Sequence, residues 1–378
     1  MQERPSGWNW STALIPGVAL GFFAVIAYPP QIEGQDKALN QLVETGQQLQ
    51  AQGRYVEAES LLQSALDRAE ASSEALVVAR TMNDLGAVKH TRGDYSAAAA
   101  LYRSATEICE RHPAPLDLVA AVLLNQARLA GAEGKFEQAE ALCQRALDID
   151  RGHPDTADTM VRLAEVYRAT HQFSKAERLL EKAIPILQEA LGSEHDRVAN
   201  ACNNLGVLYC DEARFDEAAP LFRRALETYQ KAIGRDHFQV AAVLSNLALV
   251  QSQKHAYQDA VDLYSRALAI VEKSSGPEHP DVAVIVNNLG QIESLEGRYE
   301  DAEKLYLRAI GIWERSFGPT HPDVAGCLMN YAATLRKAHR KKEAAQLVAR
   351  ARQSLAMHNR ENPADSLVDW RELQRAAR

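Results

Sequence analysis

The chain has 378 residues, a formal net charge of −8, an apolar content of 46% and a charged content of 24%. This composition supports a buried core and excludes a chain that is disordered by composition. No basic cluster stands out, so the acidic balance argues against nucleic acid as a partner.

Residues 1–35 are predicted to be an N-terminal membrane anchor or signal segment. Residues 13–27 are apolar throughout, and no charge lies between Arg4 and Glu33. With its polar neighbours the run reaches marginal length for a hydrophobic helix that crosses the ~30 Å hydrocarbon core, so we expect membrane contact through residues 11–28. The weak charge asymmetry of the flanks predicts that the repeats lie outside the cytoplasm, on the periplasmic or extracellular side. A cleavable signal peptide is the alternative, because small residues precede a possible cut after Ala27.

Residues 36–358 contain eight copies of one pattern, aligned on the turn GRYEDA at residues 297–302. The aromatic residue of this turn recurs at spacings of 40, 41, 37, 42, 42, 42 and 42 residues. Its positions are Tyr55, Tyr95, Phe136, Phe173, Phe215, Tyr257, Tyr299 and, in the last copy, Lys341. Self-similarity at this period is typical of stacked helical or strand units.

Two alanine columns run through all eight copies. The first column lies three residues after the aromatic position: Ala58, Ala98, Ala139, Ala176, Ala218, Ala260, Ala302 and Ala344. The second lies seven residues further: Ala65, Ala105, Ala146, Ala183, Ala225, Ala267, Ala309 and Ala351. A helix contact too close for a larger side chain explains both columns. The apolar spacing in residues 282–295 and 299–315 predicts two helices per copy, joined by a tight turn at Gly297.

A recurring His-Pro-Asp motif precedes the first helix of some copies. It occurs at His153, His279 and His321, while the variants at His195 and His237 keep the histidine and lose the proline. Proline suits a first helical turn and aspartate complements the helix dipole, so the motif is interpreted as a helix-start signal. Adjacent repeats lie ~10 Å apart, which is too far for a row of histidines to chelate a metal.

Catalytic and cofactor motifs are not found in the sequence. It has no Gly-rich phosphate loop, no nucleophile elbow and no HExxH motif, so we predict a non-enzyme with no cofactor, no metal site and no catalytic residue. The five cysteines lie in helical apolar patterns without a CxxC pair. They are predicted to be small buried hydrophobes rather than disulfide or zinc ligands.

The motifs NNLG, GRYEDAEKLY and GPxHPDVA, spaced 42 residues apart, resemble the tetratricopeptide repeats of the kinesin light chain type. The resemblance is strong over residues 154–350 and weaker over residues 37–150. It implies an all-α, right-handed superhelical solenoid of about eight helical hairpins, here preceded by an N-terminal hydrophobic helix. It also implies a role in binding peptides or partner proteins.

Two irregularities fall between residues 150 and 190. The spacing drops to 37 because the helix that ends near Asp150 is shorter, and Pro185 lies in mid-helix. An interior proline removes one hydrogen bond and kinks a helix. We therefore predict a local change of superhelical pitch there, between a looser N-terminal half and a regular C-terminal half.

The first helix of each unit is expected to line a concave binding groove. A stripe at helical spacing through Asn287 gives the candidate peptide-binding residues: Asn83, Arg128, Arg168, Asn200, Asn203, Ser245, Asn287, Gln291 and Arg336. Amides donate and accept, which suits the backbone of an extended peptide, although the same residues could simply be solvated. A second column contains Asn125, Asn204, Asn246, Asn288 and Asn330. Its amides are predicted to bridge to the backbone of the neighbouring repeat.

Three functions remain open at this stage. The leading hypothesis is a scaffold that binds an extended peptide or partner protein in the groove. One alternative is an enzyme whose site is assembled across repeats, or a regulatory or structural subunit of a membrane-associated complex whose activity lies in a partner. Another is a purely structural spacer that holds complexes near a membrane. The sequence gives no oligomeric state.

Residues 359–378 are predicted to be a C-terminal tail or capping helix. Pro363 ends the preceding helix, and an apolar patch around Trp370 follows. The segment is interpreted as a cap over the eighth repeat. By resemblance to the peptides that kinesin light chain type repeats bind, residues 368–371 could instead occupy the groove.

Overall fold

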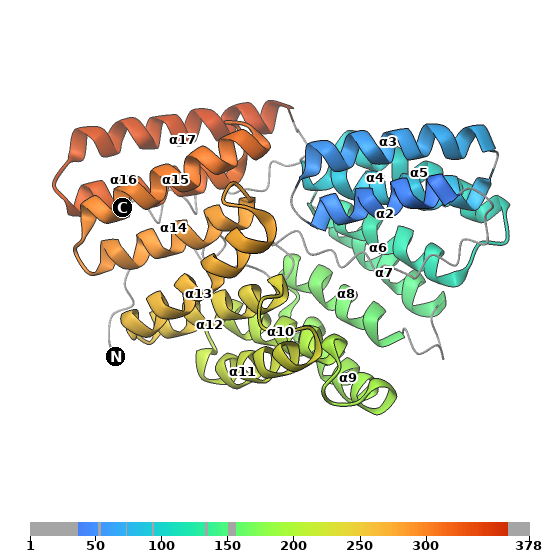
Figure 1. Cartoon of the computed structure of the whole chain (residues 1–378), viewed down its shortest axis with the longest axis horizontal. Helices are drawn as coiled ribbons and strands as arrows, with labels where there is room; N and C mark the ends of the chain where they lie inside the picture. Colours follow the sequence, from blue (N-terminus) through green and yellow to red (C-terminus); the bar gives the residue numbers. More distant parts are fainter. Residues whose placement is uncertain are drawn as a thin grey trace. The chain divides into compact units, whose positions relative to one another are not determined.

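The computed structural model describes residues 37–361, apart from 52–53, 73, 93, 133–134 and 150–155. This part of the chain contains sixteen α-helices and no strand. The helices pair into eight hairpins, four in each of two compact units that divide between Ser193 and Glu194 (Figure 1). The predicted all-α array of eight hairpins is confirmed.

The helices of the N-terminal unit, which ends at Ser193, are α2 (Lys37–Ala51), α3 (Tyr55–Ser72), α4 (Ala75–Thr91), α5 (Tyr95–Arg111), α6 (Leu116–Ala132), α7 (Phe136–Ile149), α8 (Thr156–Ala169) and α9 (Phe173–Leu191). Those of the C-terminal unit, which starts at Glu194, are α10 (Asp196–Asp211), α11 (Phe215–Ala232), α12 (Phe238–Gln253), α13 (Tyr257–Ser275), α14 (Pro280–Leu295), α15 (Tyr299–Phe317), α16 (Pro322–Lys337) and α17 (Lys341–Glu361). The second helix of every hairpin begins at the recurring aromatic position, or at Lys341 in the last hairpin.

The turn inside a hairpin requires one residue in the left-handed backbone region. Gly297 adopts it with φ of 81°, as the sequence predicts. In four other hairpins the same position is His171, Ala213, His255 or His339, with φ between 57° and 61°. Side chains with a Cβ resist this conformation, so the turn geometry is imposed by the helices that it joins.

Each first helix of the C-terminal unit starts at a histidine cap. Nδ1 of His195, His237, His279 and His321 accepts a hydrogen bond from the backbone N–H two residues later, at 3.2–3.3 Å. The helix-start interpretation is confirmed for these four residues. The imidazole nitrogen accepts the hydrogen bond of a first-turn backbone N–H, as the side-chain oxygen of Ser, Thr, Asp or Asn does at most helix starts. His153 lies outside the described residues.

Both alanine columns are buried, with every member at most 1% exposed. Glycine has a related role inside the hairpins. A Cβ added at Gly86 would lie 2.6 Å from the Tyr102 ring, and one at Gly206 would lie 2.7 Å from the Phe222 ring. The two helices of these hairpins therefore meet across a glycine and an aromatic ring.

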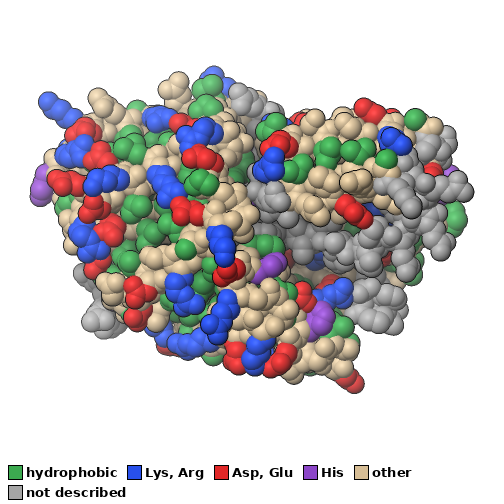
Figure 2. Space-filling view, in the orientation of Figure 1, with side chains coloured by type: hydrophobic (Ala, Val, Ile, Leu, Met, Phe, Trp, Pro, Cys, Tyr) green, Lys and Arg blue, Asp and Glu red, His purple; other side chains and the backbone are tan. Residues whose placement is uncertain are grey.

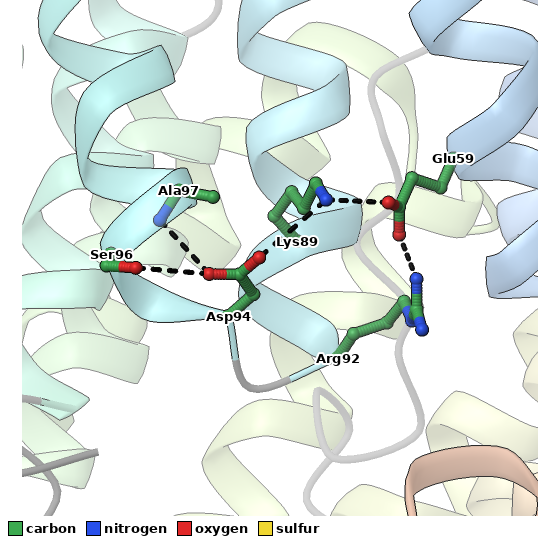
Figure 3. Close-up of polar contacts among 6 residues, drawn as sticks. All are labelled: Glu59, Lys89, Arg92, Asp94, Ser96 and Ala97. Atoms are coloured by element: carbon green, nitrogen blue, oxygen red, sulfur yellow. Dashed lines mark hydrogen bonds and ion pairs between the residues drawn. The ribbon is translucent and has the colours of Figure 1, made fainter. Parts of the chain in front are cut away.

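Ion pairs join successive hairpins, as Figure 3 shows for α3 and α4. Glu59 accepts from Lys89 Nζ at 2.6 Å and also from Arg92. Burial raises the pKa of the Glu59 carboxyl, but the two hydrogen bonds outweigh it and lower the pKa overall. In the same close-up Asp94 caps α5 by accepting from the Ala97 N–H at 3.2 Å.

The two predicted irregularities appear within the N-terminal unit. Helix α7 has 14 residues, against 19 in α9, which explains the shorter spacing. Helix α9 continues through Pro185 as one element. The change of superhelical pitch stays a prediction.

Membrane contact and the tail were predicted for residues 11–28 and 359–378. Residues 11–28, and the tail from residue 362 onward, lie outside the described residues. Within the described part of the chain, every helix is too short or too polar to cross a bilayer.

Candidate functional site

The first helices of neighbouring hairpins contact one another: α2 with α4, α4 with α6 and α6 with α8 in one unit, and α10 with α12, α12 with α14 and α14 with α16 in the other. They form a layer in each unit, and the two asparagine columns lie where these helices meet. Residues of this layer are therefore positioned by tertiary packing between repeats.

Asparagine pairs connect the layer, and we call them the amide ladder. Asn246 Nδ2 donates to Asn203 Oδ1 at 3.0 Å, and Asn330 Nδ2 donates to Asn287 Oδ1 at 3.2 Å. In the N-terminal unit Asn125 Nδ2 donates to Asn83 Oδ1 at 2.8 Å. Each rung therefore joins the second column of one repeat to the first column of the repeat before it.

The ladder corrects two details of the sequence interpretation. Three members of the second column, Asn125, Asn246 and Asn330, bridge to the neighbouring repeat, but each reaches a side chain there, whereas a backbone group was expected. Asn204 donates to Asn200 within its own helix. The first column is not simply solvated, since Asn83, Asn203 and Asn287 are only 7%, 4% and 1% exposed. Burying an amide costs free energy when its polar atoms lack partners. Here the cost is reduced because the side-chain carbonyl oxygen of each of these asparagines accepts a hydrogen bond.

Helix α12 interrupts the ladder. Ser245 takes the place of the first asparagine, is 1% exposed, and its Oγ has no hydrogen-bond partner among the described residues. The same is true of Ser252 Oγ, two turns later. The corresponding Ser294 of α14 does receive a bond, from Thr334 Oγ1 at 2.9 Å.

Charged groups replace amides in the N-terminal unit. Asp84 stands where other repeats have the second asparagine, and its carboxylate accepts from Gln47 Nε2 at 2.9 Å. Burial raises the pKa of Asp84 to about 6, against the lowering effect of that bond. The sequence analysis missed Asp84, although aligning NDLG (residues 83–86) with NNLG would have found it.

Arg128 lies beside this rung. Its guanidinium is 3.5 Å from both Asn125 Oδ1 and His90 Nδ1. Burial, with the nearby Arg128 charge, lowers the pKa of His90 to about 3, so this imidazole is neutral. Burial also lowers the pKa of Arg128 to about 10, which leaves it charged at neutral pH.

The other candidate residues are more accessible. Asn200 is half-buried and accepts from Asn204 Nδ2 at 3.2 Å, within α10. Gln291 is half-buried one turn beyond the ladder position of α14, and Arg168 is half-buried near the end of α8. Arg336 is exposed near the end of α16. The structure thus connects the asparagines and Arg128 to the ladder and leaves Arg168, Gln291 and Arg336 at its edge.

The five cysteines are free, and four of them are buried, as the sequence predicts. Burial raises the pKa of Cys143 to about 12, so this thiol stays protonated. No group of three or more His, Cys, Asp and Glu side chains in the described ranges could hold a metal ion.

The sequence pattern of the Tetratricopeptide repeat family matches six stretches, of which the last five overlap in succession: residues 40–111, 118–189, 155–231, 197–273, 239–310 and 281–356. No protein among the curated sequences matches the chain. The family match covers both units, including the weaker N-terminal copies.

Two solved structures with a TM-score above 0.5, BtubC and a Rap protein, share the fold. BtubC (BKLC) of P. vanneervenii is 24% identical, covers 59% of this chain and 92% of its own, and gives a TM-score of 0.51. Kinesin light chain repeats of Podosopora anserina are also 24% identical, over 55% of this chain and 98% of their own, with a TM-score of 0.47. A Rap protein complexed with competence and sporulation factor is 14% identical, over 85% of this chain and 100% of its own, with a TM-score of 0.53.

Proposed function

Because the chain belongs to the tetratricopeptide repeat family, we propose that it is a scaffold which binds an extended segment of a partner protein along its first helices. The repeat motifs of the sequence agree with the family match. Stacked repeats of this kind form an extended concave surface that can bind a partner protein. The array acts by binding, and any catalysis resides in its partner.

The observation that carries the proposal is the interruption of the amide ladder at α12. A buried hydroxyl without a partner costs free energy, and Ser245 and Ser252 present two of them. Both hydroxyls are closed off from solvent, so a peptide backbone, which supplies N–H and C=O groups at regular intervals, can satisfy them only when α12 shifts relative to α10 or α14. Asn200 and Gln291, half-buried on the flanking helices α10 and α14, can bond the same backbone.

In the N-terminal unit, Arg128 contributes a positive charge next to the Asn83–Asn125 rung. On this proposal each unit can bind its own segment, and a segment bound by the C-terminal unit presents uncharged backbone. An acceptor side chain or carboxylate would face Arg128, because a guanidinium binds carboxylates through paired N–H groups.

The test uses the full chain to select from a library of random 12-residue peptides, followed by affinity measurement by fluorescence anisotropy. Ser245→Asn should restore an amide at the interrupted rung and weaken binding by about tenfold, and Gln291→Ala should weaken it by about fivefold. Arg235→Gln, at an exposed site away from the ladder, is the matched control. The proposal fails if no peptide is selected, or if all three variants bind equally.

We also propose that residues 11–28 hold the chain at a membrane, with the repeats outside the cytoplasm. The support is the uncharged apolar run at residues 13–27. Protease added to spheroplasts should degrade the repeats, while full protection would place them on the other side. N-terminal sequencing that finds Trp8 in the mature protein would distinguish an anchor from a cleaved signal peptide.

A further inference from the structure

The last hairpin has a charge unlike that of the rest of the chain. Residues 336–360 contain eight Lys or Arg and one Glu, within a chain of net charge −8. The expectation that no basic cluster stands out is therefore wrong for this segment. On the face drawn in Figure 2, by contrast, Lys and Arg lie mixed with Asp and Glu over most of the surface.

Four of these cations lie on the outward side of α17, and we call them the α17 basic face: Lys341, Lys342, Arg352 and Arg360. All four are exposed, while Ser354 and His358 on the opposite side of the helix are buried. At 3.6 residues per turn, Lys341 and Arg352 form one row, and Lys342 and Arg360 form a second row roughly 100° further round.

Three exposed alanines lie between the two rows: Ala345, Ala349 and Ala356. Their small side chains leave a low strip along the helix, with longer cationic side chains on both sides. No acidic residue lies in this arc of α17.

The four cations form no ion pair or hydrogen bond with the described residues. Some cations elsewhere in the C-terminal unit are paired, as in Lys231–Glu194 at 2.7 Å and Lys304–Asp301 at 2.8 Å. Even Arg350, on the same helix, pairs with Glu314 of α15. Other cations, such as the scattered and exposed Arg223, Arg235 and Arg266, also have no partner among the described residues. The basic face differs from these isolated arginines because its four unpaired cations lie on one arc of a single helix, and this arc contains no acidic residue.

The position of the face in the array explains why part of it is open. In α15 the equivalent stripe is Glu303, Ile310 and Glu314, and both carboxylates pair with arginines of the following hairpin. Ile310 on that stripe is 4% exposed, and Arg352 occupies its place in α17. Ala345, Arg352 and Ala356 of α17 therefore lie on the stacking face of the last hairpin, at the edge of its unit in Figure 1. Lys342 takes the place of Glu300, which is exposed in α15. A surface with both positive and negative side chains would be enough to keep the end of a repeat array soluble. Solubility alone therefore does not explain four cations on an arc without an acidic residue.

We propose that the α17 basic face binds an extended acidic segment of a partner protein, separately from the groove. Lys341 to Arg360 spans 19 residues, or about 28 Å of helix, which matches about eight or nine residues of extended chain. Successive side chains of an extended chain point to opposite sides, so acidic residues can reach both rows across the alanine strip.

Nucleic acid fits this face less well. Double-stranded DNA carries one charge per ~1.7 Å, or about 16 charges over the same length, against four cations. The remainder of the chain is acidic and would repel the uncompensated phosphates. A bilayer-binding helix would need large apolar side chains in place of the alanines.

The experiment measures binding of the full chain to a fluorescein-labelled peptide of ten glutamates, by anisotropy at low and moderate salt. Binding is expected at low salt and should weaken at least tenfold at moderate salt. The variant Lys341→Gln/Lys342→Gln/Arg352→Gln/Arg360→Gln should bind at least tenfold more weakly, with an unchanged melting temperature.

The matched control removes the same charge from four scattered exposed arginines: Arg103→Gln/Arg223→Gln/Arg235→Gln/Arg266→Gln. It should change affinity less than twofold. Equal losses in both variants would show general charge attraction and overturn the proposal. Single-stranded DNA or phosphatidylglycerol vesicles could also bind this face. If either binds more tightly than the glutamate peptide, and this binding is lost in the α17 variant, the proposal that the face binds an acidic peptide is overturned. Peptides selected for the groove should bind the α17 variant normally, so this proposal and the proposed function can fail independently.

Discussion

The two units share one hairpin plan but differ in the polar residues between their first helices. The C-terminal unit places neutral amides and hydroxyls there, with histidine caps at all four helix starts. The N-terminal unit places Asp84, His90 and Arg128 at comparable positions, and the described cap of α4, Glu74, makes no side-chain hydrogen bond. The buried alanine columns are the same in both. The hairpin therefore depends on close apolar packing, while the polar layer can vary in charge.

The largest expected effect tests the shared part of the plan. Ala98→Leu in one unit and Ala302→Leu in the other should each overpack a helix contact and lower the free energy of unfolding by ~1–3 kcal/mol. Urea unfolding measures the change. Ala345→Leu, at an exposed alanine of α17, is the matched control and should cost under ~0.5 kcal/mol. Equal costs at all three sites would mean that the columns do not decide the packing.

The second prediction exchanges the polar character of the units. The folded-state pKa of Asp84 is raised to about 6 from 3.8, so its contribution to stability is fully present below pH 3.8 and lost as pH rises through 6. At pH 7.5, Asp84→Asn should therefore stabilise the fold by on the order of 1–3 kcal/mol, and by less at pH 5.

The reverse exchange is Asn288→Asp in the C-terminal unit, where the side chain is 3% exposed. It should destabilise the fold at pH 7.5 and less so at pH 5, because protonation removes the buried charge. Chemical denaturation at both pH values provides the readout. A pH-independent effect in both variants would contradict a charged Asp84.

The third prediction concerns helix starts. His279→Ala removes the acceptor for the Asp281 N–H and should cost ~0.5–2 kcal/mol. Glu74→Ser in the N-terminal unit should gain up to about 1 kcal/mol, because it supplies a cap that α4 lacks. Amide hydrogen exchange in the first turns of α14 and α4 locates each effect. Unchanged exchange in both turns would show that capping does not explain the difference between the units.

The smallest expected effect lies in the hairpin turns. Ala213 has φ of 59°, a conformation that costs an alanine roughly 1 kcal/mol. Ala213→Gly should remove this conformational cost from the folded state. The greater entropy of glycine in the unfolded chain offsets part of the benefit, so the free energy of unfolding should rise by only a few tenths of a kcal/mol. Thermal unfolding should show a slightly raised midpoint, whereas a lowered one would indicate that the turn is not strained.

The sequence by itself determined the hairpins. The aromatic position marks the start of every second helix, histidine marks the first helices of the C-terminal unit, and the alanine columns mark the contacts. These signals are local, because helix starts, turns and apolar stripes depend on residues within a few positions of one another.

The tertiary structure decided which polar side chains contact one another. Asn246 and Asn203 are 43 residues apart, and only the stacking of α12 on α10 places one amide within 3.0 Å of the other. Stacking also buries Asp84 and so raises its pKa. Because no hairpin follows α17 among the described residues, Arg352 stays exposed, whereas Ile310 at the same position of α15 is covered, for the physical reason that a face is covered only where a neighbour covers it.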